Sequence, residues 1–158
     1  MDSTNEFSLI QLPQFHPLRG TYCRLKLKNG RISPFIRGED ISVQIAIGDW
    51  FLLITNCDNY DWTSHWVYLV NSDGKILDML STPDYFGFAE KLCYESPSSI
   101  SVGFFGTNDR WTISVEGDGY WSFDISAILR RLNSFVVRKR YLMARCTKGE
   151  KWVFQGTR

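Results

Sequence analysis

Alternating apolar and polar residues, interrupted by short turns, recur along most of this 158-residue chain. Thr21–Lys28 shows the pattern most clearly, because a cysteine and two leucines alternate there with basic residues. Successive side chains of a strand point to opposite faces, so this segment predicts a half-buried strand with a basic outer face. Asn29-Gly30 follows it and is typical of a two-residue hairpin turn. Repeated hairpins of this kind predict antiparallel sheets.

Three more predicted hairpin turns divide the chain: the two-residue turn Gly48-Asp49 and the longer turns Asn71–Gly74 and Thr107–Asp109. Residues 50–54 are apolar on both faces, which predicts a central strand, and the polar residues 55–64 predict a loop. Pro34 cannot donate to a ladder, so its strand is expected at an edge. The predicted strands are 21–28, 31–36, 41–47, 50–54, 65–70, 75–80, 99–105, 110–115, 120–123, 135–146 and 151–155.

Two segments have helical spacing. Thr82-Pro83 fits a helix start, and the apolar residues between Tyr85 and Leu92 repeat accordingly. Asp124–Asn133 is the clearer amphipathic helix. Residues 1–20 hold two prolines and no period, which predicts an N-terminal arm before a single β-rich domain, 21–158. The expected fold class is mainly β (α+β): an antiparallel, hairpin-rich sheet, sandwich or half-barrel with two short helices.

The residues that usually carry catalysis or metal binding are sparse. The four cysteines are widely spaced, which favours buried reduced thiols over a disulfide scaffold or a zinc site. No nucleotide-binding, serine-hydrolase or metalloprotease motif occurs, so we expect no cofactor, no metal and no enzyme activity. The N-terminus carries acids rather than a signal peptide's basic residues, and no apolar run approaches the roughly 20 residues of a membrane span. These features predict a cytoplasmic protein.

Charge is unevenly distributed along the chain. Residues 41–127 carry three basic and twelve acidic side chains, whereas residues 128–158 carry nine basic and one acidic. Opposite potentials arise if the two segments separate in space. The alternative is that the segments neutralise each other as neighbours in the fold.

The acidic segment contains a candidate protein-binding loop. Asp58 and Asp61 alternate there with Tyr60 and Trp62. Large aromatics supply rigid contact area and carboxylates steer a basic partner, so we expect this loop to bind a protein. The same hypothesis includes two further acids, Asp73 and Asp78.

Two other functions remain open. A nucleic-acid-binding module is the first alternative, although a net charge of +1 disfavours it. Its candidate residues are Arg130, Arg131, Arg138, Lys139 and Arg140. The second alternative is a small hydrolase of unknown substrate, with a site among Asp58, Asp61 and His65.

Two segments, Gly48–Ile54 and Trp66–Asp78, give the chain a family resemblance. Strand–turn–strand units that end in an aspartate make it similar to the immunity proteins of bacterial polymorphic-toxin and contact-dependent growth inhibition systems. The resemblance covers about a quarter of the chain and brings no catalytic motif. It implies a non-enzymatic bacterial protein whose partner is a cognate toxin, namely a toxin C-terminal domain. Toxin nucleases are often basic, which would suit an acidic binding region.

Overall fold

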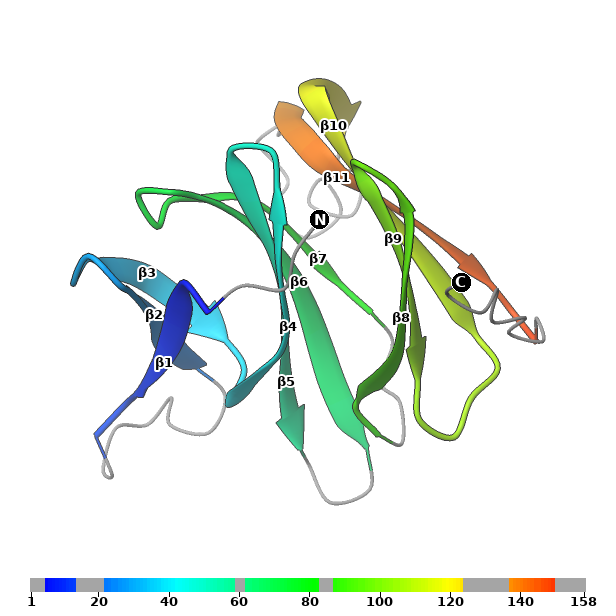
Figure 1. The fold of residues 1–158 in the computed structure, drawn as a ribbon, viewed down its shortest axis with the longest axis horizontal. Coiled ribbons are helices and arrows are strands. Elements are labelled where there is room, and N and C mark those ends of the chain that lie inside the picture. Colours follow the sequence, from blue (N-terminus) through cyan, green and yellow to red (C-terminus); the bar gives the residue numbers. More distant parts are fainter. Residues whose placement is uncertain (1–4, 14–21, 59–61, 83–86, 124–136, 150–158) are drawn as a thin grey trace, which may run out of the picture.

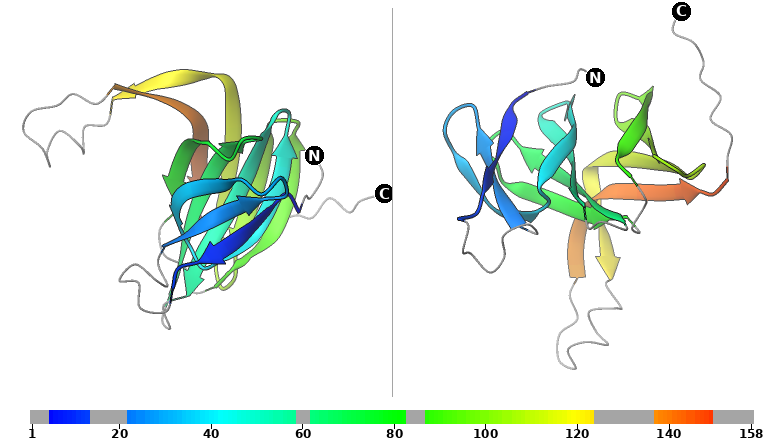
Figure 2. Two further views of the ribbon diagram at one scale, coloured as in Figure 1. Left: turned by 90° about the vertical axis from the view of Figure 1, so that its left-hand side faces the viewer. Right: turned by 90° about the horizontal axis from the view of Figure 1, so that it is seen from below.

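The computed structural model describes residues 5–13, 22–58, 62–82, 87–123 and 137–149. Within them, eleven strands form three antiparallel sheets stacked as layers (Figure 1, Figure 2). We call these the first sheet (β1–β3), the central sheet (β4–β7) and the third sheet (β8–β11). The mainly β, antiparallel prediction is confirmed, and the described residues contain no helix.

The first sheet has the order β1 (Phe7–Gln11), β2 (Tyr22–Leu27) and β3 (Ile32–Arg37). Gly30 takes a positive φ of 83° in the β2–β3 turn, as expected for Asn-Gly. β3 is an edge strand, and its Pro34 is exposed. β1 lies inside the segment that the sequence predicted as an arm. It pairs with β2, and the Gln44 side-chain amide fastens it to β4 by two 2.9 Å bonds to the Phe7 backbone.

The central sheet has the order β4 (Asp40–Ile47), β5 (Trp50–Asp58), β6 (Thr63–Asn71) and β7 (Ile76–Ser81). β5 is flanked by β4 and β6, as its apolar faces predicted. The predicted loop 55–64 is wrong at both ends, because β5 continues to Asp58 and β6 begins at Thr63. Thr55, Asn56 and His65 are polar but buried, since layers cover both faces of this sheet.

The third sheet has the order β11 (Val137–Thr147), β10 (Arg110–Phe123), β9 (Ser99–Phe104) and β8 (Ala89–Ser96). The β10–β11 ladder is irregular between Val115 and Tyr120, and beyond this bulge both strands bend away from the layers (Figure 2, left). The predicted helix 82–92 is wrong over its last turn, where Ala89 and Leu92 pair with Phe104 and Val102. The predicted helix 124–133 and strand 151–155 lie outside the described residues.

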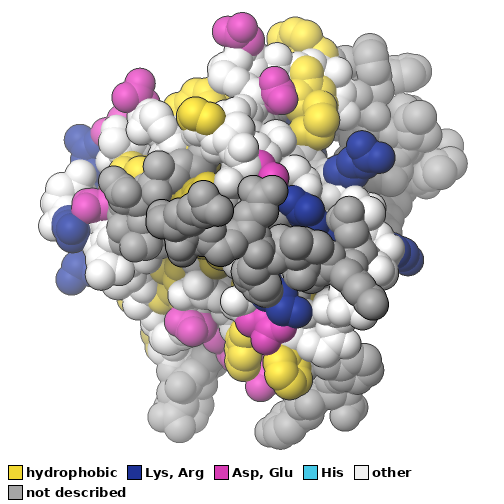
Figure 3. Space-filling view, turned by 45° about the vertical axis from the view of Figure 1, so that its right-hand side comes forward, with side chains coloured by type: hydrophobic (Ala, Val, Ile, Leu, Met, Phe, Trp, Pro, Cys, Tyr) yellow, Lys and Arg dark blue, Asp and Glu magenta, His cyan; other side chains and the backbone are white. Residues whose placement is uncertain are grey.

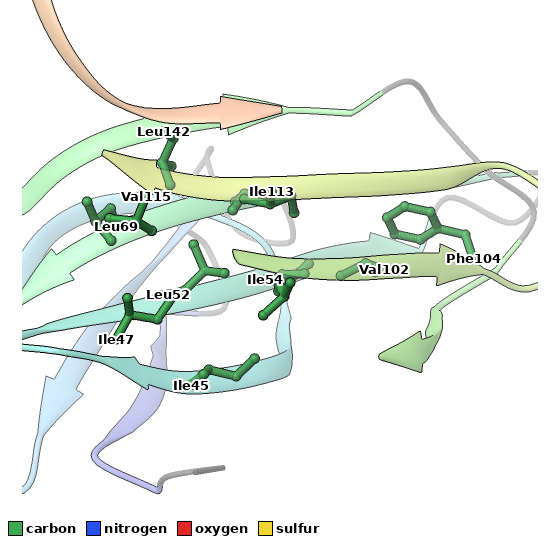
Figure 4. Packing of buried hydrophobic residues seen from close by; sticks show 12 residues of the cluster. Ile45, Ile47, Leu52, Ile54, Leu69, Val102, Phe104, Ile113, Val115 and Leu142 are labelled. Carbon is green, nitrogen blue, oxygen red and sulfur yellow. The ribbon is translucent and has the colours of Figure 1, made fainter. Parts of the chain in front are cut away.

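Two hydrophobic cores lie on opposite faces of the central sheet. One is shared with the third sheet, where Leu52, Ile54 and Leu69 face Val102 and Ile113 (Figure 4). The other is shared with the first sheet and contains Leu53, Tyr68 and Val70 together with residues of β2. β5 and β6 therefore supply alternate side chains to both cores, which explains why these two strands are almost entirely buried.

A buried ion pair also joins the central and third sheets. Asp78 on β7 is fully buried and lies 3.0 Å from the Arg140 guanidinium on β11. The same carboxylate accepts backbone N–H groups from Tyr141 and Leu142 at 2.7 and 2.9 Å. At this contact the acidic and basic segments neutralise each other.

No disulfide joins the four cysteines; Cys23 and Cys57 are buried, and Cys93 and Cys146 are partly exposed. Burial raises the pKa of Cys23 to about 12 and, together with the neighbouring Glu39, that of Cys57 to about 11. In the part of the chain that the structure describes, no helix is long and apolar enough to cross a membrane.

Candidate functional site

Those of the predicted partner-binding residues that the structure describes do not form one surface. Asp58 and Trp62 are exposed at the β5–β6 connection, and Tyr60 and Asp61 lie outside the described residues. Asp73 lies at the other end of β6, in the β6–β7 turn. Its carboxylate pairs with the Arg31 guanidinium, so its charge is already compensated.

Asp78 requires a correction to the interface hypothesis. Its side chain is 0% exposed and bonds to Arg140 and to β11 backbone groups, so it cannot face a partner in this fold. A buried charge is tolerated only when it is paired and hydrogen-bonded, and both conditions hold here. Asp78 therefore joins two sheets rather than contributing to a binding surface.

The structure describes only part of the basic set of the nucleic-acid alternative. Arg130 and Arg131 lie outside the described residues, and only the backbone of Arg138 is placed, opposite Ser122. Lys139 is exposed, with its ammonium 5.4 Å from the Tyr141 ring centroid. Arg140 is occupied by Asp78 and by the Met79 carbonyl, so this residue is not available to a phosphate backbone.

The hydrolase alternative depends on His65, which is fully buried. Its Nε2 lies 2.9 Å from the Gly87 carbonyl oxygen, and its ring packs against Phe104 with centroids 4.4 Å apart. A side chain in this position cannot reach a substrate together with Asp58. No cluster of three or more potential metal ligands occurs among the described residues.

A groove with acidic and aromatic lining lies elsewhere, between the tips of the central and third sheets. Two adjoining hollows of about 400 and 490 Å³ share Gly48 of the β4–β5 turn and Pro97 of the β8–β9 turn. Both turns lie at the same end of the molecule, the upper end of Figure 1. We call this feature the tip groove. Its lining residues are Ala46, Ile47, Gly48, Asp49, Trp50, Tyr94, Glu95, Ser96, Pro97, Ser98, Val115 and Gly117.

The aromatic side chains of the tip groove are held differently. Trp50 is half-buried and packs edge-on against Tyr141, with ring centroids 5.6 Å apart. Tyr94 belongs to the edge strand β8 and is 48% exposed. The Trp50 ring is thus held in place by its packing, whereas the Tyr94 ring faces solvent. The groove therefore presents one rigid and one accessible aromatic side chain.

The charge of the tip groove is negative. Among the described residues, its lining includes the acidic residues Asp49 and Glu95 and no basic residue. Asp49 is exposed, whereas the Glu95 carboxylate pairs with the Arg110 guanidinium outside the lining. A hydrogen bond from Ser101 and the nearby Arg110 guanidinium lower the pKa of Glu95, so it is ionised at neutral pH. Glu116 and Asp118 flank the lining residue Gly117 and are exposed. Figure 3 shows acidic and hydrophobic side chains close together at this upper end.

Sequence reasoning missed this site because its parts come from three separate turns. The sequence predicted a turn at Gly48-Asp49, and it placed Ser96–Ser98 and residues 116–119 between predicted elements. Nothing in the spacing shows that residues 48, 97 and 117 meet. Aromatics next to acidic turns, Asp49-Trp50 and Tyr94-Glu95, are the only local signal that could have indicated it.

Comparison of the chain with protein families, curated proteins and solved structures finds no match.

Proposed function

We propose that this chain is a non-enzymatic inhibitor of the immunity type, which binds a cognate toxin and blocks it. The observation that carries the proposal is the tip groove, where two large aromatics lie beside acidic residues and none of the described lining residues is basic. Buried aromatics at the centre of an interface supply most of its binding energy, and surrounding charges steer the encounter. The proposed partner is therefore a basic surface that carries an apolar anchor.

This proposal keeps the chemistry inferred from the sequence and changes its location. Asp58 and the Trp50 of the tip groove lie at opposite ends of β5, a nine-residue strand, so they are about 27 Å apart. The resemblance to immunity proteins supplies the partner class: the C-terminal domain of a bacterial toxin, met in the cytoplasm. Basic toxin domains, nucleases among them, suit the negative groove.

The test compares two charge reversals in a toxin-neutralisation assay. Proteins captured by the tagged chain from its host are expressed alone, to find one that is toxic, and then together with the chain. We expect Asp49→Lys with Glu116→Lys to abolish rescue, because the reversed charges would repel a basic toxin. Both side chains are exposed, so neither hydrophobic core is altered. The matched control is Asp58→Lys with Asp61→Lys, which makes the same charge change at the other end of β5.

Each result has a distinct meaning. Loss of rescue only in the groove variant supports the tip groove as the toxin site. Loss only in the loop variant would move the toxin site to residues 58–62 and refute the groove. If no captured protein is both toxic alone and harmless with the chain, the inhibitor proposal itself is refuted.

A further inference from the structure

The outer face of the first sheet has chemistry unlike that of the tip groove. Its β2 residues alternate between buried Cys23 and Leu25 and outward Arg24 and Lys26. No other described strand covers this face, which is turned toward the viewer in the left panel of Figure 2. From β3, Ile32 and Phe35 are 53% and 42% exposed on the same side.

The ladder arranges these side chains in rows across the sheet. Ile10, Arg24 and Phe35 are cross-strand partners in one row. Lys26 and Ile32 are partners in the next row, and Tyr22 and Arg37 in the row on the other side. Rows two residues apart along a strand are about 7 Å apart. Across the strands, each cation of this face therefore lies beside an apolar or aromatic group.

Two of the cations are held by aromatic rings. The Arg24 guanidinium lies 4.3 Å above the Phe35 ring centroid. The Arg37 guanidinium lies 5.5 Å from the Tyr22 centroid, and its Nε donates to the Tyr22 hydroxyl at 3.2 Å. Such stacking fixes a guanidinium while its outward surface and N–H groups stay open to a ligand.

The face has an excess of positive charge. At its rim, Lys28 pairs with Glu6 and Arg31 pairs with Asp73. Among the described residues no carboxylate forms an ion pair with Arg24, Lys26 or Arg37. Three cations on one open sheet are thus available to a polyanion.

We propose that the outer face of the first sheet binds single-stranded nucleic acid. Open sheet faces bind single strands by stacking bases on aromatic rings and guanidinium planes, while cations contact the phosphates. The mixture of flat rings and uncompensated cations fits this ligand because every nucleotide carries both a planar base and a phosphate. The proposal is independent of the tip groove, which lies between the other two sheets.

The test measures fluorescence anisotropy of a labelled, mixed-sequence DNA strand of about 12 nucleotides with the full chain. Three phosphate contacts on a single strand predict that log affinity falls against log salt with a slope of about −2. Arg24→Glu with Lys26→Glu should reduce this slope to about −0.7 and weaken binding. Arg145→Glu with Lys148→Glu is the matched control. It makes the same charge change at two exposed residues in and just after β11, a strand of the third sheet.

A second pair of variants tests stacking. Phe35→Ala should weaken binding roughly tenfold, since it removes a base-stacking ring. Phe105→Ala, at a 60% exposed phenylalanine after β9, should leave affinity unchanged. Thermal unfolding checks that every variant is folded.

Three results would overturn the inference. The first is no anisotropy change at about 50 mM salt, where such contacts are strongest. The second is equal loss in both charge variants, which would mean non-specific attraction. The third is unaltered affinity in Phe35→Ala together with equal competition by polyglutamate, which would identify a site for acidic protein instead.

Discussion

At the scale of single residues, Asp78 has the largest structural role among the charged side chains described. Its two oxygens accept from the backbone of Met79, Tyr141 and Leu142, and they pair with Arg140. Arg140 in turn donates to the Met79 carbonyl at 3.0 Å. One carboxylate thus accepts hydrogen bonds from backbone N–H groups of both β7 and β11. These are edge strands of different sheets and form no ladder with each other.

Asp78→Ala should therefore destabilise the protein strongly. It leaves the Arg140 Nε and three backbone N–H groups without their acceptor, and breaking a buried pair typically costs about 3–5 kcal/mol. Asp73→Ala removes the exposed pair with Arg31 and should cost less than about 1 kcal/mol. Urea unfolding followed by tryptophan fluorescence measures both; similar losses in the two variants would contradict this role for Asp78.

The sequence could not assign Asp78 to the interior. It follows a predicted hairpin turn by a few residues, and a lone acid in such a strand normally faces solvent. Its partner Arg140 is 62 residues away, so only the assembled sheets reveal the pair. Cys23 and Leu25, by contrast, were placed correctly on the buried face from local alternation alone.

At the scale of elements, the connection between β3 and β4 passes unusually close to the central sheet. Gly38 there has a φ of 124°, and a Cβ on it would lie 2.6 Å from the Thr55 Cβ. The Thr55 hydroxyl also donates to the Arg37 carbonyl at 2.7 Å. This approach joins the first sheet to β5 and requires a residue without a side chain.

Gly38→Ala is expected to cost more than Gly30→Ala. Both residues have positive φ, so both variants incur backbone strain of roughly 1–2 kcal/mol. Only Gly38 meets a neighbour, and forcing a methyl into packed structure adds about 1–3 kcal/mol. Gly30 faces open space and serves as the matched control. Equal denaturation midpoints for the two variants would show that Thr55 moves away freely.

Local patterns predicted most strands but failed where tertiary contacts decide. Residues 89–92 have helical spacing, yet β9 offers a ladder to them, and pairing outweighs weak propensity. The sequence of β1 has no clear period, so local pattern did not predict this strand. The Gln44 amide and pairing with β2 hold it in place. Thr55 and Asn56 are polar, yet they belong to β5 because they pair with Trp66 and His65 of β6.

At the scale of the whole molecule, the central sheet is common to two cores. The sequence predicted antiparallel hairpins. It did not predict which hairpins share a sheet or which sheets pack together, because local patterns do not distinguish one hairpin partner from another. The layers place the tip groove and the first-sheet face on different parts of the surface. The two proposed sites therefore do not overlap, and each is formed by its own set of turns or strands.

Sharing β5 and β6 also predicts that the two cores unfold together. Removing the first sheet would expose Leu53, Tyr68 and Val70 of the central sheet, and losing the third sheet would expose Leu52 and Leu69. Exposing apolar surface of this size opposes the separate opening of one layer.

The thiol of Cys23 reports on the first-sheet core specifically. It is fully buried, and burial raises its pKa to about 12, so it should not react with an alkylating reagent at pH 8 in the native state. We expect pulse alkylation of Cys23 across a urea gradient to follow the same curve as circular dichroism and tryptophan fluorescence. Cys93, partly exposed on the edge strand β8, should react without urea and serves as the positive control. Alkylation of Cys23 at lower urea than the spectroscopic transition would show that the first sheet opens as a separate unit.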